Sequence, residues 1–358
     1  MLKIAIVGCG KIADSHAEQI RRIDSGRLVA VCDREPLMAR QLADRFGIEG
    51  AFSDLNEMLD SVSPDVVHIT TPPQTHLSIA KLCLDSGAHV YVEKPFTLNV
   101  DEARTLLATA ERCGRCVTVG HDDQFSHAAR RLRKSIESGM IGGNPLHLES
   151  IYCYDMASTS YAKALLGDKN HWVRSLPGGL LQNVISHGIA RLAEWLPGAP
   201  TICATGRVSP ALRALGETQI VDELRVVMTG DEGTTAFFTF SSQIRPSLHS
   251  FRVYGSQGSL ELDEDQQTLI YRSGTRFKSH AERFIPPVQL AHQYHKNLFH
   301  NLWLFARRDF QFKSGMKHLM ESFYDSILND TAPPIPEGEI IRGTQIMDDI
   351  FHQLSAAQ

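Results

Sequence analysis

A glycine-rich turn separates the first apolar run of the chain from the first helical pattern. Its sequence is Gly8-Cys9-Gly10-Lys11-Ile12-Ala13, a G-x-G-x-x-A spacing. In such a turn the first glycine permits a tight bend, the second lets a pyrophosphate approach the backbone, and the alanine keeps strand and helix close. The N–H groups at the start of the helix attract the phosphates. We therefore predict a dinucleotide site here, with Gly8, Gly10, Lys11 and Ile12 contacting the cofactor.

An acidic residue ends the second predicted strand. Asp33 stands 20 residues after Ala13, where an acidic side chain binds the ribose hydroxyls in this kind of site. A carboxylate accepts hydrogen bonds from the 2′-hydroxyl and repels a 2′-phosphate, so Asp33 favours NAD over NADP. The neighbouring Arg34 keeps NADP open as an alternative, because a guanidinium can pair with that phosphate or stack on the adenine. We expect both residues at the cofactor.

Two further polar segments follow the fourth and fifth predicted strands. They are Thr71-Pro72-Pro73-Gln74-Thr75-His76 and Glu93-Lys94-Pro95. Ligands of doubly wound sheets bind in the crevice at the carboxyl ends of the strands. We expect Thr71, Pro72, His76 and Glu93 at the cofactor, and Lys94 both there and at the reacting group. The alternative for Lys94 is a surface ammonium paired with Glu93.

The order of apolar runs predicts the elements that position these residues. Short runs rich in branched residues, typical of parallel strands covered on both faces, alternate with helical patterns. The runs lie at residues 3–7, 28–32, 66–70, 89–92 and 116–119, and the clearest helical pattern lies at residues 101–112. This alternation predicts right-handed βαβ units in an α/β fold with a doubly wound parallel sheet. We assign the resulting Rossmann domain to residues 1–122.

The pattern changes after residue 122. Helical patterns occupy residues 126–138 and 180–196, and strand-like runs occupy residues 146–152, 223–228, 234–240, 250–254 and 259–262. Closely spaced strands joined by glycine-containing turns predict a largely antiparallel sheet. On the second helix Asn183, His187 and Arg191 fall on one polar stripe, which borders either a substrate cleft or plain solvent. We assign residues 123–358 to a substrate-binding and oligomerisation domain.

Composition limits the partners of the chain. Its net charge is −5 and its 36 basic residues form no long block, so we expect no nucleic-acid partner. No charged leader precedes Ile4 and no long uncharged apolar stretch follows, so we expect neither export nor a membrane partner. Seven cysteines, an odd number, indicate reduced thiols, although Cys113 and Cys116 form a C-x-x-C pair that redox or metal sites also use. A cytoplasmic protein fits these features.

Together these motifs resemble the glucose–fructose oxidoreductase, inositol dehydrogenase and rhizopine-catabolism (Gfo/Idh/MocA) family. The resemblance covers essentially the whole chain and includes V-G-H-D-D-Q-F at 119–125 and the segment from Trp172 to His187. It implies an N-terminal Rossmann domain and a C-terminal α+β domain with a large open, mainly antiparallel sheet. Two positions depart from the family pattern, since Gln124 stands where arginine is common and Asn183 stands where the family has aspartate.

The resemblance also implies roles for single residues. Lys94 hydrogen-bonds the reacting oxygen and His187 carries the proton, whereas Asn183 can orient a group but cannot act as a base. Trp172, Arg174 and Gln124 lie in segments found beside the cofactor.

These roles define an NAD(P)-dependent oxidoreductase that transfers a hydride between nicotinamide and a hydroxyl or keto carbon of a sugar, sugar nucleotide or polyol. A histidine can accept the hydroxyl proton because its ordinary pKa is about 6.5. Two alternatives are an NAD-using glycosidase and a non-catalytic dinucleotide- or sugar-binding regulator. The family and an aromatic-rich stretch at 284–312 favour a homodimer or homotetramer. Histidines 292, 295 and 300 in that stretch lack a carboxylate or cysteine pair nearby, so no metal site is predicted.

Overall fold

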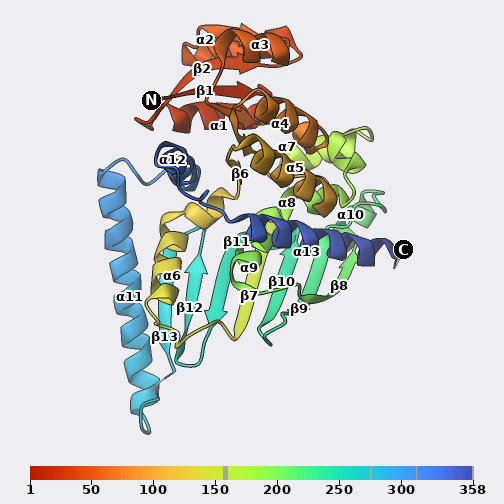
Figure 1. The fold of residues 1–358 in the computed structure, drawn as a ribbon. Coiled ribbons are helices and arrows are strands. Elements are labelled where there is room, and N and C mark those ends of the chain that lie inside the picture. The colour runs from red at the N-terminus through yellow and green to blue at the C-terminus, as the bar shows by residue number, and fades with distance from the viewer. Residues whose placement is uncertain (156–159, 275, 312, 357–358) are drawn as a thin grey trace. The chain divides into compact units, whose positions relative to one another are not determined.

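The chain forms two compact units, described here from a computed structural model whose elements are drawn in Figure 1. The structure describes residues 1–155, 160–274, 276–311 and 313–356. Unit 1 comprises Met1–Asp122 and Gly315–Gln345, and unit 2 comprises Asp123–Ser314 and Ile346–Gln358. The segment 315–345 thus belongs to the same unit as the N-terminal residues, unlike the predicted division, in which all residues from 123 onward form the second domain.

Unit 1 is built on a six-stranded sheet with the strand order β3-β2-β1-β4-β5-β6, in which every pair is parallel. Its elements are β1 (Leu2–Val7), α1 (Lys11–Ile20), β2 (Gly26–Cys32), α2 (Pro36–Phe46), β3 (Gly50–Phe52), α3 (Leu55–Val62), β4 (Val66–Ile69), η1 (Pro73–Thr75), α4 (His76–Asp85), β5 (His89–Val92), α5 (Val100–Cys113), β6 (Val117–Val119) and most of α12 (Ser314–Leu328). The predicted doubly wound sheet is confirmed. Strand β3 was not predicted, because its three residues are too few to show a pattern.

Local sequence signals set several helix ends. Asn99 caps α5 by accepting a hydrogen bond from the Glu102 N–H at 2.9 Å, as an N-cap residue does. Pro36 occupies the first turn of α2, where its missing N–H costs little. Ser126 caps α6 (His127–Glu137) in the same way as Asn99. These caps explain why the predicted helix limits agree with the structure to within a residue or two.

Unit 2 is built on a seven-stranded sheet with the order β13-β12-β11-β7-β10-β9-β8. All pairs are antiparallel except β7 with β10. The elements are η2 (Asp122–Phe125), α6, β7 (His147–Asp155), α7 (Ser160–Gly167), η3 (Trp172–Ser175), α8 (Gly179–Val184), α9 (Ser186–Trp195), β8 (Thr201–Arg207), α10 (Pro210–Ala214), β9 (Glu223–Thr229), β10 (Thr235–Ser241), β11 (Gln243–Tyr254), β12 (Gly258–Asp263), β13 (Thr268–Ser273), α11 (Ala281–Ala306) and the second part of α13 (Glu337–Ala356). The predicted mainly antiparallel sheet is confirmed.

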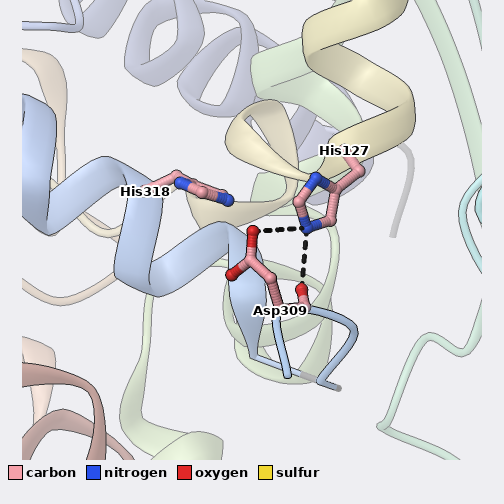
Figure 2. A group of neighbouring side chains, drawn as sticks. All are labelled: His127, Asp309 and His318. Atoms are coloured by element: carbon pink, nitrogen blue, oxygen red, sulfur yellow. Dashed lines mark hydrogen bonds and ion pairs between the residues drawn. The ribbon is translucent and has the colours of Figure 1, made fainter. Parts of the chain in front are cut away.

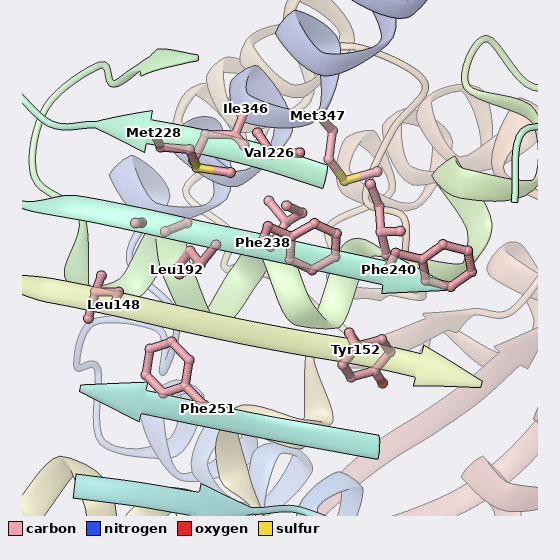
Figure 3. Packing of buried hydrophobic residues seen from close by; sticks show 14 of the residues in the cluster. Leu148, Tyr152, Leu192, Val226, Met228, Phe238, Phe240, Phe251, Ile346 and Met347 are labelled. Atoms are coloured by element: carbon pink, nitrogen blue, oxygen red, sulfur yellow. The ribbon is translucent and has the colours of Figure 1, made fainter. Parts of the chain in front are cut away.

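Helix α9 packs closely against the sheet of unit 2 (Figure 3). Leu192 of α9 is buried among Leu148 and Phe238 of the strands. A Cβ atom at Gly188 would lie 2.6 Å from a ring carbon of Phe238 and 2.9 Å from the Tyr152 Cβ, so only glycine allows this approach. The single helix predicted at 180–196 is divided at residue 185 into α8 and α9.

Helix α11 lies along the edge strand β13 and is held there by amide side chains. Gln293 hydrogen-bonds both the N–H and the carbonyl of Tyr271, at 2.8 and 2.9 Å. Four residues later Asn297 does the same to Leu269, at 3.1 and 3.0 Å. The four-residue spacing places both amides on one face of the helix. This ladder satisfies backbone groups that an edge strand otherwise exposes.

Candidate active site

The glycine-rich turn of unit 1 joins β1 to α1 and has the geometry of a phosphate cradle. Gly8 has a φ of +93°, and a Cβ atom there would come within 2.7 Å of the Thr71 side chain. Gly10 has open space where a Cβ atom would stand, and it directly precedes the first turn of α1. A side chain at Gly10 would fill this space at the start of α1, and the first N–H groups of a helix have no partner within the helix. The turn therefore fits the pyrophosphate of a dinucleotide, with Lys11 and Ile12 in the first helical turn.

Asp33 follows β2 and lies next to the turn. Its Oδ2 accepts a hydrogen bond from the Cys9 N–H at 2.7 Å, and its Oδ1 accepts one from the Glu35 N–H at 2.9 Å. Two backbone donors thus fix the carboxylate beside the loop, while it keeps lone pairs for ribose hydroxyls. Arg34 is exposed beside it. Burial raises the pKa of the Cys9 thiol to about 12, so that thiol stays protonated.

Glu93 ends β5 and belongs to a buried chain of hydrogen bonds. Its Oε1 lies 2.8 Å from His16 Nε2, and His16 Nδ1 lies 2.9 Å from His68 Nδ1. His68 Nε2 lies 2.8 Å from the Tyr324 hydroxyl. Burial lowers the pKa of His68 well below its usual range, so this ring is neutral. With Glu93 as a carboxylate, one tautomer assignment gives each bond one donor and one acceptor: Tyr324 donates to His68, His68 to His16, and His16 to Glu93.

Lys94 directly follows Glu93, which ends this series of buried hydrogen bonds. It is half-buried, and its N–H lies 3.2 Å from Glu93 Oε2. His76 is buried, with Nε2 2.9 Å from the Thr71 carbonyl and Nδ1 3.1 Å from the Pro95 carbonyl. The His76 ring thus connects the segments that follow β4 and β5. In the loop before it, Thr71 is half-buried, and Pro72, Gln74 and Thr75 are exposed.

His187 lies in the first turn of α9 in unit 2 beside a carboxylate that the sequence analysis did not single out. His187 Nδ1 is 3.9 Å from Asp123 Oδ2, and the Tyr152 hydroxyl donates to the same oxygen at 2.8 Å. Burial by itself raises the pKa of Asp123, but His187, Arg191 and the Tyr152 hydrogen bond outweigh it and lower the pKa to about 2. Asp123 is therefore charged.

A second buried carboxylate, that of Glu264, lies next to Arg191. Arg191 is only 4 % exposed; it donates to the Asp123 carbonyl at 2.7 Å and pairs with Glu264. Burial raises the pKa of Glu264 to about 7, although Arg191 acts in the opposite direction. The predicted polar stripe of Asn183, His187 and Arg191 is thus no solvated face, because Arg191 is an interior ion-pair partner.

Three residues of unit 2 are predicted to lie beside the cofactor: Gln124, Trp172 and Arg174. Two of them, Gln124 and Arg174, contact carboxylates of unit 2. Gln124 is 1 % exposed, and its Nε2 lies 3.2 Å from a Glu194 carboxylate oxygen of α9. Arg174 pairs with Glu217 at 2.9 Å and donates to the Leu165 carbonyl. The Trp172 ring stacks on the His171 ring and is about one-third exposed. The cofactor contacts expected for Gln124, Trp172 and Arg174 stay predictions.

A cavity of about 840 Å³ opens in unit 2 beside Arg174. It lies between the segment from η3 to α8 and the loop that precedes β9, and the end of α13 closes it with Phe351 and Leu354. Neither His187 nor Asp123 lines it. The cavity is therefore separate from the His187–Asp123 pair.

Comparison with known families decides the classification. Residues 2–121 match the oxidoreductase family model with an NAD-binding Rossmann fold, and residues 129–261 match the GFO/IDH/MocA C-terminal domain. The chain belongs to the GFO/IDH/MocA oxidoreductase family. The family, the α/β fold and the NAD-binding Rossmann domain predicted from the motifs are all confirmed.

Several relatives of this oxidoreductase carry dehydrogenase names. D-apiose dehydrogenase of Paraburkholderia graminis is 28% identical over 297 residues, which cover 81% of this chain and 74% of that protein. Myo-inositol 2-dehydrogenase of Thermotoga maritima is 26% identical over 75% of this chain and 77% of its own. The WlbA dehydrogenase of Bordetella pertussis, solved with NADH and UDP-GlcNAcA, superposes with a TM-score of 0.79 at 16% identity, over 100% of this chain and 96% of that one. At 16% identity, the similarity to the WlbA dehydrogenase shows a shared fold only.

No described helix of this oxidoreductase combines the length and apolarity that crossing a membrane requires. Two groups of metal-ligating side chain types lie close together among the described residues: His127, Asp309 and His318, and Asp122, Asp123 and His187. His292, His295 and His300 belong to neither group.

Proposed function

We propose that this oxidoreductase is an NAD-dependent dehydrogenase that acts on a CH–OH group of a sugar, polyol or sugar nucleotide. The observation that carries the proposal is the 3.9 Å approach of His187 to the charged Asp123, in a chain that also holds the dinucleotide turn. Histidine is the side chain that most often acts as a general base, and a neighbouring carboxylate can orient its ring. The names of the D-apiose and myo-inositol relatives support the substrate class.

Three residues have separate roles in the proposed reaction. Bound NAD supplies the hydride acceptor. Lys94 donates a hydrogen bond to the substrate oxygen and stabilises the negative charge that develops there. His187 takes the hydroxyl proton on Nε2, because Nδ1 is turned toward Asp123. Asn183 has no titratable group, so it orients the substrate or His187.

A substrate panel tests the proposal. The purified protein is mixed with NAD or NADP and with D-apiose, myo-inositol or UDP-N-acetylglucosamine, and the absorbance of reduced nicotinamide is followed. We expect reduction of NAD with at least one compound, and loss of turnover but not of NAD binding in Lys94→Met and His187→Gln. Three results would contradict it: a preference for NADP, glycoside hydrolysis without net reduction as in an NAD-using glycosidase, or NAD binding without turnover as in a regulator.

We further propose that the enzyme is a homo-oligomer that associates through α11. The face of α11 opposite the amide ladder exposes large apolar side chains. Their exposed fractions are 53% for Leu298, 66% for Phe299, 52% for Leu302, 48% for Trp303 and 69% for Phe305. Because the ladder fixes the helix on β13, this face is a formed surface rather than a displaced part of the core. A second copy offers the same apolar face and thus a self-complementary partner.

We also propose that the enzyme is cytoplasmic, because its cysteines form no disulfides. All seven cysteines, including the Cys113 and Cys116 pair, are free. Unpaired cysteines in this number are typical of a reducing compartment. Fractionation of the source cells would test this placement.

A further inference from the structure

The active-site helix lacks the acid that its family carries. Asn183 stands one helical turn before His187, where the resemblance implies an aspartate. An amide cannot stabilise a charged imidazole as a carboxylate does. The structure nevertheless places a charged carboxylate at His187, from a different element. Asp123 lies in η2, at the start of unit 2.

Asp123 is held in a defined orientation. The Tyr152 hydroxyl donates to Oδ2 at 2.8 Å, the same oxygen that lies 3.9 Å from His187 Nδ1. Arg191 donates to the backbone carbonyl of Asp123 at 2.7 Å, which fixes the main chain as well. Gly188 allows α9 to approach Tyr152 closely enough for this arrangement.

Three other carboxylates lie in this region. Glu264 pairs with Arg191 and accepts hydrogen bonds from Ser126 and Gln267. Asp265 lies 2.8 Å from His249 Nδ1. Asp122, the neighbour of Asp123 in η2, has a carboxylate oxygen within 4.8 Å of both Asp123 and His187.

We propose that Asp123 is the positioning residue that supplies to His187 the carboxylate that position 183 lacks. At 3.9 Å it acts through its charge: it favours the proton on Nδ1 in the neutral ring and stabilises the ring when Nε2 takes up the substrate proton. The carboxylate thus comes from the η2 turn and not from the helix that carries His187. This inference rests on the proposed function.

Nitrogen-15 NMR of the histidine rings tests the proposal without a substrate. Spectra of the NAD-bound protein are recorded for wild type and Asp123→Asn, with the His187 signals assigned by His187→Gln. We expect the neutral His187 ring to carry its proton on Nδ1 in the wild type and to shift toward the Nε2–H form in Asp123→Asn. Unchanged His187 nitrogen shifts in the variant would overturn the proposal.

A second histidine–aspartate pair in unit 2 serves as a control. His127 Nε2 lies 3.5 Å from an Asp309 carboxylate oxygen and 2.8 Å from the Asp309 backbone carbonyl (Figure 2). Because Asp309→Asn keeps that carbonyl, the His127 proton should stay on Nε2, and the signals of His187 should be unchanged. If Asp123→Asn does not fold, Asp123→Ser takes its place, since it also removes the carboxylate and should shift the His187 ring in the same direction.

Turnover supplies the second readout. With whichever panel substrate the wild type oxidises, we expect Asp123→Asn to lower kcat about 100-fold while KM changes little. We expect Asp123→Asn/Asn183→Asp to recover part of that loss. Equal kcat values in Asp123→Asn and wild type would overturn the proposal. If the wild type oxidises no panel substrate, the proposed function fails, and the nitrogen shifts still decide the role of Asp123.

Discussion

His16 Nε2 lies 2.8 Å from Glu93 Oε1 in the interior of unit 1, and the His16 ring has no exposed surface. His16 belongs to α1, the helix that follows the glycine-rich turn, and Glu93 directly precedes Lys94. The bond therefore connects the helix of the dinucleotide turn to the backbone of the residue expected to polarise the substrate. Through His68 it continues to Tyr324 of α12, which explains why that distant helix is part of the first unit.

Removing the central ring should destabilise unit 1 strongly. His16→Leu leaves both the Glu93 carboxylate and the His68 Nδ1 group buried without their partner, which costs about 3 kcal/mol. Tyr324→Phe removes only the last donor of the chain and should cost about 1 kcal/mol. Urea unfolding of the two variants measures the difference. Equal stabilities for His16→Leu and the wild type would show that the hydrogen bonds from Tyr324 to Glu93 do not stabilise the fold.

Asp33 should control cofactor choice. Asp33→Ala removes the charge-assisted hydrogen bonds to the ribose hydroxyls, each worth about 1.5–3 kcal/mol, so NAD affinity should fall at least about tenfold. It also removes the repulsion of a 2′-phosphate, so NADP affinity should fall less or rise. Calorimetric titration with both cofactors gives the ratio. Because Asp33 also accepts from the Cys9 N–H, thermal unfolding must confirm that the variant is folded. An unaltered preference for NAD would contradict the role of Asp33.

Glu264 should make stability depend on pH. Its pKa is raised by burial from the ordinary 4.5 to about 7, so the folded state holds its proton more tightly than the unfolded state. Its stabilising contribution is therefore full below pH 4.5 and is lost as the pH rises through about 7. Glu264→Gln should gain stability relative to the wild type over this window. Denaturant titrations at pH 5 and pH 8 measure the change, and a difference that does not depend on pH would refute it.

The exposed face of α11 should determine the oligomeric state. We expect the double variant Phe299→Glu/Trp303→Glu to elute as a monomer, because two charges in a buried apolar contact are strongly unfavourable. Leu82→Glu is a matched control, since Leu82 is 47% exposed on α4 in the other unit. Light scattering coupled to size exclusion measures the mass. A wild type that is itself monomeric would contradict association through this face.

Regular patterns made much of the fold predictable. The parallel strands of unit 1 are buried on both faces, so their apolar runs stand out from the amphipathic helices. Asn99 and Pro36 marked helix ends by local hydrogen bonding and backbone geometry, which depend on nearby residues alone. Strands β8 and β13 were missed, because edge strands bury fewer side chains and their pattern is weaker.

Long-range pairing explains what could not be predicted. Asp123 acquires its role from Tyr152 and His187, which are distant in sequence. The D-D pair at 122–123 was visible as part of a family segment, but its spacing carries no sign of a histidine partner. Likewise Arg174 pairs with Glu217, because the loop before β9 brings that carboxylate to it. Such contacts are decided by how elements pack.

The most direct test of the account is calorimetric titration of NAD into the wild type and Gly10→Val. A valine side chain would occupy the open space at Gly10 without meeting other protein atoms at its Cβ. The account therefore predicts that the variant unfolds at the temperature of the wild type but binds NAD at least about 100-fold more weakly, because the pyrophosphate loses its place at the start of α1. Wild-type protein that takes up no NAD, or a variant that binds it equally well, would contradict the dinucleotide site and the dehydrogenase built on it.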